Sequence, residues 1–201
     1  MNRKYKITNI AHPQHPWLHR VRACVDIGEA IKAGDLGGFV ESEANLSFEP
    51  GDEAWLFGDS ICCGDACVST GAVLRNSAVA KDRAFVSHDA VLSGSSIAED
   101  DALVRDAALA ENTRVSGYGM LIQSADTGYC PEAIGHAAIY GKVIGNYLLA
   151  GDTVICPGEE FHNDCKDRLW LYDNKRTVQR ETSRDELKPR TRQQKRRGHV
   201  R

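Results

Sequence analysis

Residues 54–113 divide into ten consecutive groups of six: AWLFGD, SICCGD, ACVSTG, AVLRNS, AVAKDR, AFVSHD, AVLSGS, SIAEDD, ALVRDA and ALAENT. Every group begins with Ala or Ser, and its second and third residues are apolar. The last two positions are mostly Gly, Asp, Asn, Ser or Thr, which favour turns. Ten groups in phase indicate a repeat architecture built from one short structural unit.

Each group predicts a short β-strand followed by a turn. Side chains alternate between the two faces of a strand, so we expect the first and third residues to point inward and the second outward. Three groups then close one coil of ~18 residues, and successive coils stack at the strand spacing of ~4.8 Å. A single coil leaves its strands unpaired, so the fold needs neighbouring coils and closed ends.

The groups resemble the hexapeptide-repeat, left-handed parallel β-helix family. The family pattern is an aliphatic residue, a turn, and Ala or Ser four positions after the aliphatic residue, as in residues 56–60 (LFGDS) and 92–96 (LSGSS). Residues 20–28, 32–41 and 43–47 look like a bacterial and phage subfamily whose members are often labelled only provisionally as transferases. The resemblance, rather than the spacing, implies the left hand of the coil.

The chain divides into four parts, and the predicted fold class is all-β. Residues 1–40 hold two alternating stretches around a proline-containing loop, which predicts an N-terminal β-hairpin cap. Residues 41–116 are the predicted β-helix. Residues 117–175 lose the phase and predict an irregular β section, either a less regular coil or a small sheet. Residues 176–201 lack periodic apolar residues and predict a flexible, basic tail.

Composition narrows the protein class. The chain has 201 residues, of which 42% are hydrophobic and 26% charged, as in globular proteins. It contains no apolar run of ~18 residues, so no membrane span is expected. The first residues lack an apolar signal core, which predicts a cytoplasmic location, in the host if a phage encodes the chain. Seven cysteines, an odd number, predict reduced thiols in that compartment.

The C-terminal segment carries a concentrated positive charge. Within residues 188–201 there are seven basic residues and no acidic one, namely Lys188, Arg190, Arg192, Lys195, Arg196, Arg197 and Arg201. The whole chain has a net charge of −3, so the part before this segment is acidic. The segment has two interpretations: a solubilising end, or a non-specific contact with nucleic acid or an acidic protein surface. The acidic body should itself repel nucleic acid.

The resemblance also implies one chemistry. Familiar enzymes of this fold are acyltransferases that act at the subunit interfaces of a trimer, with a histidine general base and acyl-coenzyme A along the coil. The candidates here are His88 with its neighbour Asp89, and His136. His88 is equally explained as a polar turn residue, because other groups hold Gly, Thr, Asn or Asp at its position. Those enzymes usually eject a long loop from one coil, and residues 54–113 contain no such insertion.

The spacing of the candidate ligands does not favour a metal site. One set of candidate ligands is His12, His15 and His19, and the other is Cys130, Cys156, His162 and Cys165. Prolines in the first set indicate a hairpin loop, and the second set lacks the spacing of a zinc finger. We therefore predict no metal and no resident cofactor, with acyl-coenzyme A expected only if the chain is an acyltransferase.

The second position of each group is apolar although it is expected to face outward. The resulting outer stripes comprise Trp55, Val73, Val91 and Leu109, then Ile61, Val79 and Ile97, and then Phe85 and Leu103. Exposed apolar stripes of this length exceed what a soluble monomer usually shows. We therefore expect at least one stripe to be covered by the N-terminal hairpin, by residues 120–175 or by another subunit. Of these, we favour a homo-oligomer, a trimer or a dimer.

Two functions remain open at this point. The first is a non-catalytic binding or assembly module, phage-encoded in one version, that presents a rigid acidic surface to a host protein partner. The second is an acyltransferase that uses one of the two histidines above. The missing loop and the absence of a convincing catalytic set favour the first.

Overall fold

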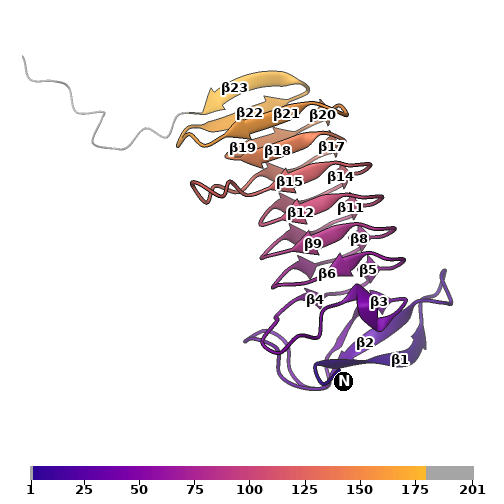
Figure 1. Cartoon of the computed structure of the whole chain (residues 1–201). Helices are drawn as coiled ribbons and strands as arrows, with labels where there is room; N and C mark the ends of the chain where they lie inside the picture. Colours follow the sequence, from indigo (N-terminus) through magenta and orange to yellow (C-terminus); the bar gives the residue numbers. More distant parts are fainter. Residues whose placement is uncertain (1, 180–201) are drawn as a thin grey trace, which may run out of the picture.

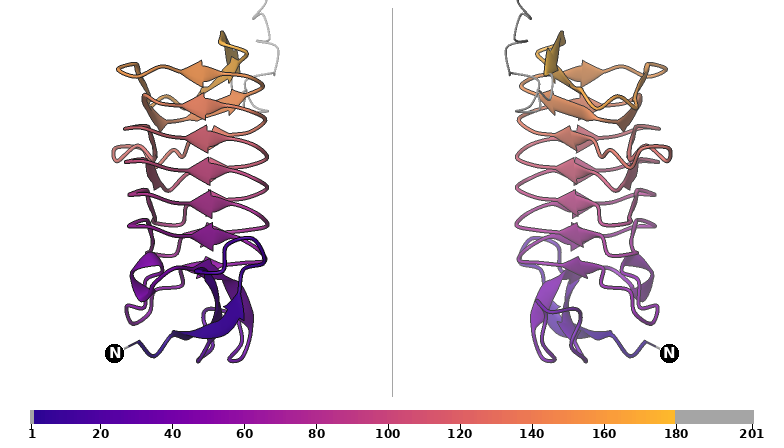
Figure 2. Two further views of the ribbon diagram at one scale, coloured as in Figure 1. Left: turned by 90° about the vertical axis from the view of Figure 1, so that its right-hand side faces the viewer. Right: turned by 90° about the vertical axis from the view of Figure 1, so that its left-hand side faces the viewer.

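The computed structural model describes residues 2–179 as an all-β chain with one short 3-10 helix, η1 (Glu43–Asn45). Its body is a parallel β-solenoid of about seven turns, seen from the side in Figure 1 and as a stack of coils in Figure 2. In each turn the chain passes from an eight-stranded sheet to a nine-stranded sheet and then to a six-stranded sheet. Within residues 2–179 no helix is long and apolar enough to span a membrane.

Each sheet runs along the length of the solenoid. The nine-stranded sheet holds β1 (Tyr5–Ala11), β2 (His19–Ala23), β3 (Leu36–Val40), β5 (Ile61–Cys62), β8 (Val79–Ala80), β11 (Ile97–Ala98), β14 (Arg114–Val115), β17 (Ala138–Ile139) and β20 (Val154–Ile155). The eight-stranded sheet holds β4 (Trp55–Leu56), β7 (Val73–Leu74), β10 (Val91–Leu92), β13 (Ala108–Leu109), β16 (Glu132–Ala133), β19 (Tyr147–Ala150), β22 (Arg168–Tyr172) and β23 (Lys175–Gln179). The six-stranded sheet holds β6 (Cys67–Val68), β9 (Phe85–Ser87), β12 (Leu103–Arg105), β15 (Met120–Ile122), β18 (Lys142–Gly145) and β21 (Glu160–Asn163). Pairing is parallel except for β1 with β2, β2 with β3, and β22 with β23.

The interior follows from the repeat. The first residue of a group lies near a corner, where the chain turns and little space remains, and Ala72, Ala78 and Ala90 are fully buried there. The third residue fills the centre, as Leu74 and Leu92 do, both fully buried. Equivalent residues of successive coils are buried to the same extent, because each strand pairs in register with the strand one coil away. Burying a leucine side chain stabilises a fold by about 1.5–3 kcal/mol.

The phase slips by one residue between β12 and β13. Ala107 takes the small corner position, and Ala108 is the Cα partner of Val91 on the outer side. Leu109 therefore points inward and is fully buried. The group that begins at Ala102 has five residues instead of six before the next corner alanine, which accounts for the slip. The expectation of ten groups in phase, with Leu109 on an outer stripe, is wrong.

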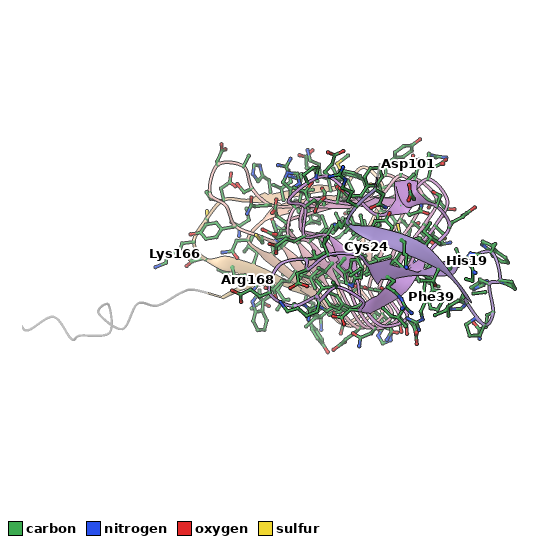
Figure 3. The ribbon with its side chains drawn as sticks, turned by 90° about the horizontal axis from the view of Figure 1, so that it is seen from below. His19, Cys24, Phe39, Asp101, Lys166 and Arg168 are labelled. Atoms are coloured by element: carbon green, nitrogen blue, oxygen red, sulfur yellow. The ribbon has the colours of Figure 1, made fainter. Side chains whose placement is uncertain are left out.

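Trp55 shows that the N-terminal strands cover part of one outer stripe, which is one of the three covers expected. It holds an outer position on β4, yet it is only 1% exposed because the N-terminal strands cover it. The ring of Tyr5 on β1 meets it edge-on, with ring centroids 6.4 Å apart. Figure 3 shows these strands lying in front of the coils when the molecule is viewed from below. The stripe residues farther along the solenoid are half-buried, or exposed in the case of Phe85.

The section after residue 116 continues the coil and does not form a separate small sheet. β14 to β21 continue the parallel ladders of all three sheets, interrupted by one loop between β15 and β16. The solenoid then ends in the antiparallel pair of β22 and β23. Residues 176–179, which the sequence grouped with the basic tail, belong to β23.

Candidate functional site

The corner where the chain leaves the six-stranded sheet for the eight-stranded sheet is here named the site corner. Three longer connections leave the solenoid at this corner, at residues 47–54, 123–131 and 164–167. The other turns along it are short. In Figure 1 the salmon loop between β15 and β16, residues 123–131, projects well beyond the stack.

A large hollow lies at the lower end of the site corner and is named the acidic groove. It has a volume of about 870 Å³, between a wall of residues 27–31 and 47–53 and a floor of the first coils. The floor includes Phe57, Val73 and Arg75. Among the described residues that line it, six carry a carboxylate and one is an arginine; the six are Glu29, Glu49, Asp52, Glu53, Asp89 and Asp106.

Asp52 fastens the groove wall to the solenoid. Its carboxylate accepts hydrogen bonds from the backbone amides of Thr70 and Gly71 at 2.8 and 2.9 Å, and from that of Ala54 at 2.8 Å. Burial alone would raise the pKa of Asp52, but the hydrogen bonds from Ser47 and from these three amides outweigh it and hold the pKa below its ordinary value. The carboxylate therefore stays ionised and keeps the loop docked.

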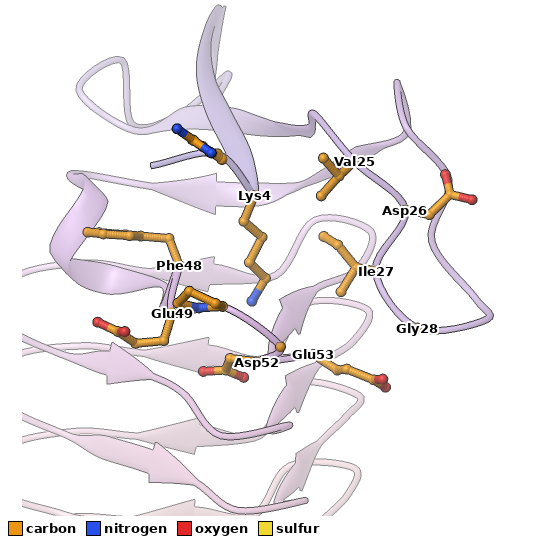
Figure 4. Close-up of a pocket in the computed structure, with 12 residues that line it drawn as sticks. Lys4, Val25, Asp26, Ile27, Gly28, Phe48, Glu49, Asp52 and Glu53 are labelled. Atoms are coloured by element: carbon orange, nitrogen blue, oxygen red, sulfur yellow. The ribbon is translucent and has the colours of Figure 1, made fainter. Parts of the chain in front are cut away.

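Lys4 supports the same wall from behind. Its ammonium group donates to the backbone carbonyls of Ser47 at 2.9 Å and Ala54 at 2.8 Å. Burial lowers the pKa of Lys4 to about 8, against the opposing effect of Asp52 and Glu53. Figure 4 shows the side chain directed toward residues 48–53, beside a second hollow of about 580 Å³. The two hollows share residues 27–28 and 49–53, so Lys4 braces the partition between them.

His88 and Asp89 lie on the groove floor but do not pair with each other. The His88 backbone has a φ of +48°, the left-handed conformation that Asn76, Asp82 and Gly94 adopt at the equivalent positions. The hydrogen bond of its ring goes to Ser87 Oγ at 3.2 Å. Among the described residues, neither a hydrogen bond nor an ion pair joins His88 to Asp89. The geometry thus matches the turn interpretation of His88.

His136 stands on another corner, where the chain passes from the eight-stranded to the nine-stranded sheet. Its ring lies between two turn residues of adjacent coils. Nε2 is 3.5 Å from Asn112 Nδ2, and Nδ1 is 3.7 Å from Asp152 Oδ1. The side chain is exposed. The structure therefore separates the two histidines that the sequence nominated for one role.

A histidine–carboxylate pair that the sequence did not single out lies at the base of loop 123–131. His162 Nε2 is 2.9 Å from Asp164 Oδ2. The other oxygen of Asp164 accepts a hydrogen bond from Ser124 Oγ, and Ser124 is almost fully buried. The sequence signal was the loss of phase after residue 115, which marks the inserted loop. The hydrogen bond from Ser124 to Asp164 joins residues 40 positions apart and has no local pattern.

The cysteine–histidine set named from the sequence is divided between separate contacts. Of the cysteine–histidine set, Cys130 contacts Gln123 in the loop, whereas His162 pairs with Asp164. Within residues 2–179 no three His, Cys, Asp or Glu side chains come together in a way that could hold a metal ion. The basic residues at positions 188–201 lie outside the described residues.

No protein-family model matches the chain, and no curated protein matches it. A function for the chain therefore has to be inferred from the geometry of the site corner.

Proposed function

We propose that the chain is a non-catalytic binding or assembly module that presents a rigid acidic surface to a basic segment of a protein partner. The acidic groove is the observation that carries this proposal. It combines a volume of about 870 Å³ with six carboxylates and a floor that includes the apolar side chains of Phe57 and Val73. Lysine and arginine side chains suit such a surface, because their aliphatic stems cover apolar groups while their charged ends meet carboxylates.

Four of the six carboxylates of the groove are available to a basic ligand. Within residues 2–179, Glu29, Glu49, Glu53 and Asp89 form no salt bridge, whereas Asp106 lies 3.6 Å from Nε of Arg105. Other acidic residues are paired within the chain. Glu99, on the corner between the nine- and six-stranded sheets, pairs with Lys81 and Arg114 at 2.8 Å each, for example. The four unpaired carboxylates give the groove its negative charge.

The groove is also preorganised. Its floor belongs to strands held by the parallel ladder, and its wall is held by Asp52 and Lys4. A rigid site loses little conformational entropy when a partner binds. This rigidity supports the proposal that the groove is a recognition surface.

A fluorescent nona-arginine peptide tests the proposal as a basic probe. Its binding to the full chain is followed by anisotropy at about 50 and 300 mM NaCl, since contacts between exposed charges weaken with salt. The groove variant combines Glu53→Gln, Asp89→Asn and Asp106→Asn. We expect it to bind at least tenfold more weakly than the wild type.

The matched control combines Asp65→Asn, Asp82→Asn and Glu111→Gln. It removes the same number of charges from exposed turns on the other two corners. We expect it to bind the peptide nearly as well as the wild type does. Equal weakening in both variants would show that the peptide senses net charge alone, and the proposal would then fail.

Acyl transfer is a second candidate, and one specific observation favours it. The loop that such enzymes eject from a coil, which residues 54–113 lack, is matched by residues 123–131. At its base Asp164 orients His162, and a carboxylate partner of this kind suits a histidine for general-base work. This candidate moves the role from His88 or His136 to His162. Acetyl-coenzyme A should raise Tm in the wild type, and His162→Ala should abolish the rise while His88→Ala keeps it.

The handedness of the coil, the role of the N-terminal hairpin and the assembly of the chain are further parts of what we propose. We infer a left-handed coil of the hexapeptide-repeat class, an N-terminal hairpin that acts as the cap, and a cytoplasmic, phage-encoded origin in a host cell. We also infer a homo-oligomer, because Ile61, Val79 and Ile97 form an apolar outer ladder on the nine-stranded sheet. Light scattering after size exclusion tests the assembly, and a monomer at micromolar concentration would contradict it.

A further inference from the structure

We propose that the basic segment 188–201 occupies the acidic groove of its own molecule and competes there with the partner. This inference rests on the proposed function, because it assigns an occupant to the same groove. Three observations carry it: the point where the described chain ends, the distance to the groove, and the match of charge.

The described chain ends above the groove on the same edge of the solenoid. Gln179, the last residue of β23, is the Cα partner of Arg168, the first residue of β22. Arg168 directly follows the connection 164–167 at the site corner. The chain therefore leaves β23 at the corner that carries the groove at its other end. Figure 1 shows β23 at the top of the stack and the connection before β4 at the bottom.

The length of chain beyond β23 is sufficient. Six strand spacings separate β23 from β7, whose Val73 lies on the groove floor, which corresponds to ~29 Å at ~4.8 Å per spacing. Residues 180–201 can span at most roughly 73 Å. Residues 180–187 alone reach roughly 26 Å, so position 188 can arrive at the upper part of the groove. The length of the chain therefore allows the basic segment to reach the groove.

The charges of the basic segment and of the groove are opposite in sign and similar in number. The segment has seven basic residues and no acidic one, and six carboxylates line the groove. Attachment to the same chain makes binding intramolecular, with an effective concentration in the millimolar range for a connection of this length. Even modest attraction then suffices for occupancy. A basic partner would have to displace the segment before it enters.

Competition with the nona-arginine probe tests this inference on the full chain. In the tail variant Arg190, Arg192, Arg196 and Arg197 are all replaced by serine, which leaves every described residue unchanged. If the segment occupies the groove, the tail variant should bind the probe at least fivefold more tightly than the wild type. Equal affinity of the two proteins would overturn the inference while leaving the proposed function intact. A probe that binds neither protein would instead contradict the proposed function and the inference together.

Carbodiimide coupling followed by mass spectrometry locates the segment. Lys188 and Lys195 should couple to Glu53, Asp89 or Asp106, and much less to Asp65 or Asp82 on another corner. A mixture of ¹⁴N- and ¹⁵N-labelled protein separates links within one molecule from links between molecules. Links within a molecule to the groove support the inference. Links that are exclusively between molecules, or spread equally over both corners, would overturn it.

Discussion

The ammonium group of Lys4 lies 2.8 Å from the backbone carbonyl oxygen of Ala54, 50 residues later in the chain. This contact ties the first strand to the entrance of the solenoid. It also places a buried positive charge behind the wall of the acidic groove. The stability of the protein should therefore depend on the protonation of this one side chain.

Replacement of Lys4 by methionine should change the pH dependence of stability. Burial lowers the folded-state pKa of Lys4 from an ordinary value of 10.5 to about 8. Between these values the unfolded chain binds more protons, so the Lys4 contribution to stability rises with pH. The unfolding free energy of the wild type, minus that of Lys4→Met, should increase by roughly 3 kcal/mol from pH 7.5 to pH 10.5. Urea unfolding at a series of pH values measures it.

The comparison with Lys4→Met removes the effect of other groups. Burial raises the pKa of Tyr5 and of the Cys62 thiol, which lowers stability above pH 9 in both proteins. Parallel stability curves for wild type and Lys4→Met would show that the lysine does not titrate in this window.

Leu109→Ala should destabilise the protein as much as Leu92→Ala does. Both leucines are fully buried and face the centre of the solenoid on adjacent strands of one sheet. A core Leu→Ala change costs about 2–5 kcal/mol, because it leaves a cavity. Val91→Ala, on the outer side next to Leu92, is the control and should cost clearly less. If Leu109→Ala behaved like the control, the slip in phase between β12 and β13 would be wrong.

His88→Asn should leave stability nearly unchanged, whereas His88→Val should lower it by about 1–3 kcal/mol. The position has a φ of +48°, which asparagine tolerates and a β-branched residue does not. Thermal unfolding of the two variants measures the difference. Equal Tm values for them would indicate that the turn does not require the left-handed conformation.

The cysteines should separate into two classes in a thiol titration. Cys24, Cys130, Cys156 and Cys165 are exposed, and a disulfide-exchange reagent at pH 7.5 should modify these four first. Burial raises the pKa of Cys62 well above its ordinary value, and it raises the pKa of Cys63 and Cys67 as well. These three should react slowly until denaturant is added. Rapid reaction of all seven in the native protein would contradict the described packing of β5 and β6.

Several features of the site could not be read from local sequence. The acidic groove forms only because residues 27–31 and 47–53 fold back over coils that begin near residue 55. The contact of Asp164 with Ser124 joins turns two coils apart, at the base of the inserted loop. Neither the groove nor this contact has a fixed spacing along the chain, because loop lengths vary while the strands stack at a constant distance. The turn interpretation of His88 agrees with its left-handed backbone, whereas His136, nominated for the same role, lies on a different corner.

The sequence by itself determined that this protein is an all-β chain whose coils stack in parallel. A six-residue period of small, apolar, apolar and turn residues has one economical solution, in which the small residues line crowded corners and the aliphatic residues fill the centre. The tertiary structure alone decided where that period slips, since Ala107 rather than Ala108 fits the corner. It also decided which carboxylates stand unpaired, because salt bridges such as that of Glu99 with Arg114 join residues of neighbouring coils. Periodic packing is encoded locally, whereas charge pairing and grooves depend on distant segments meeting in space.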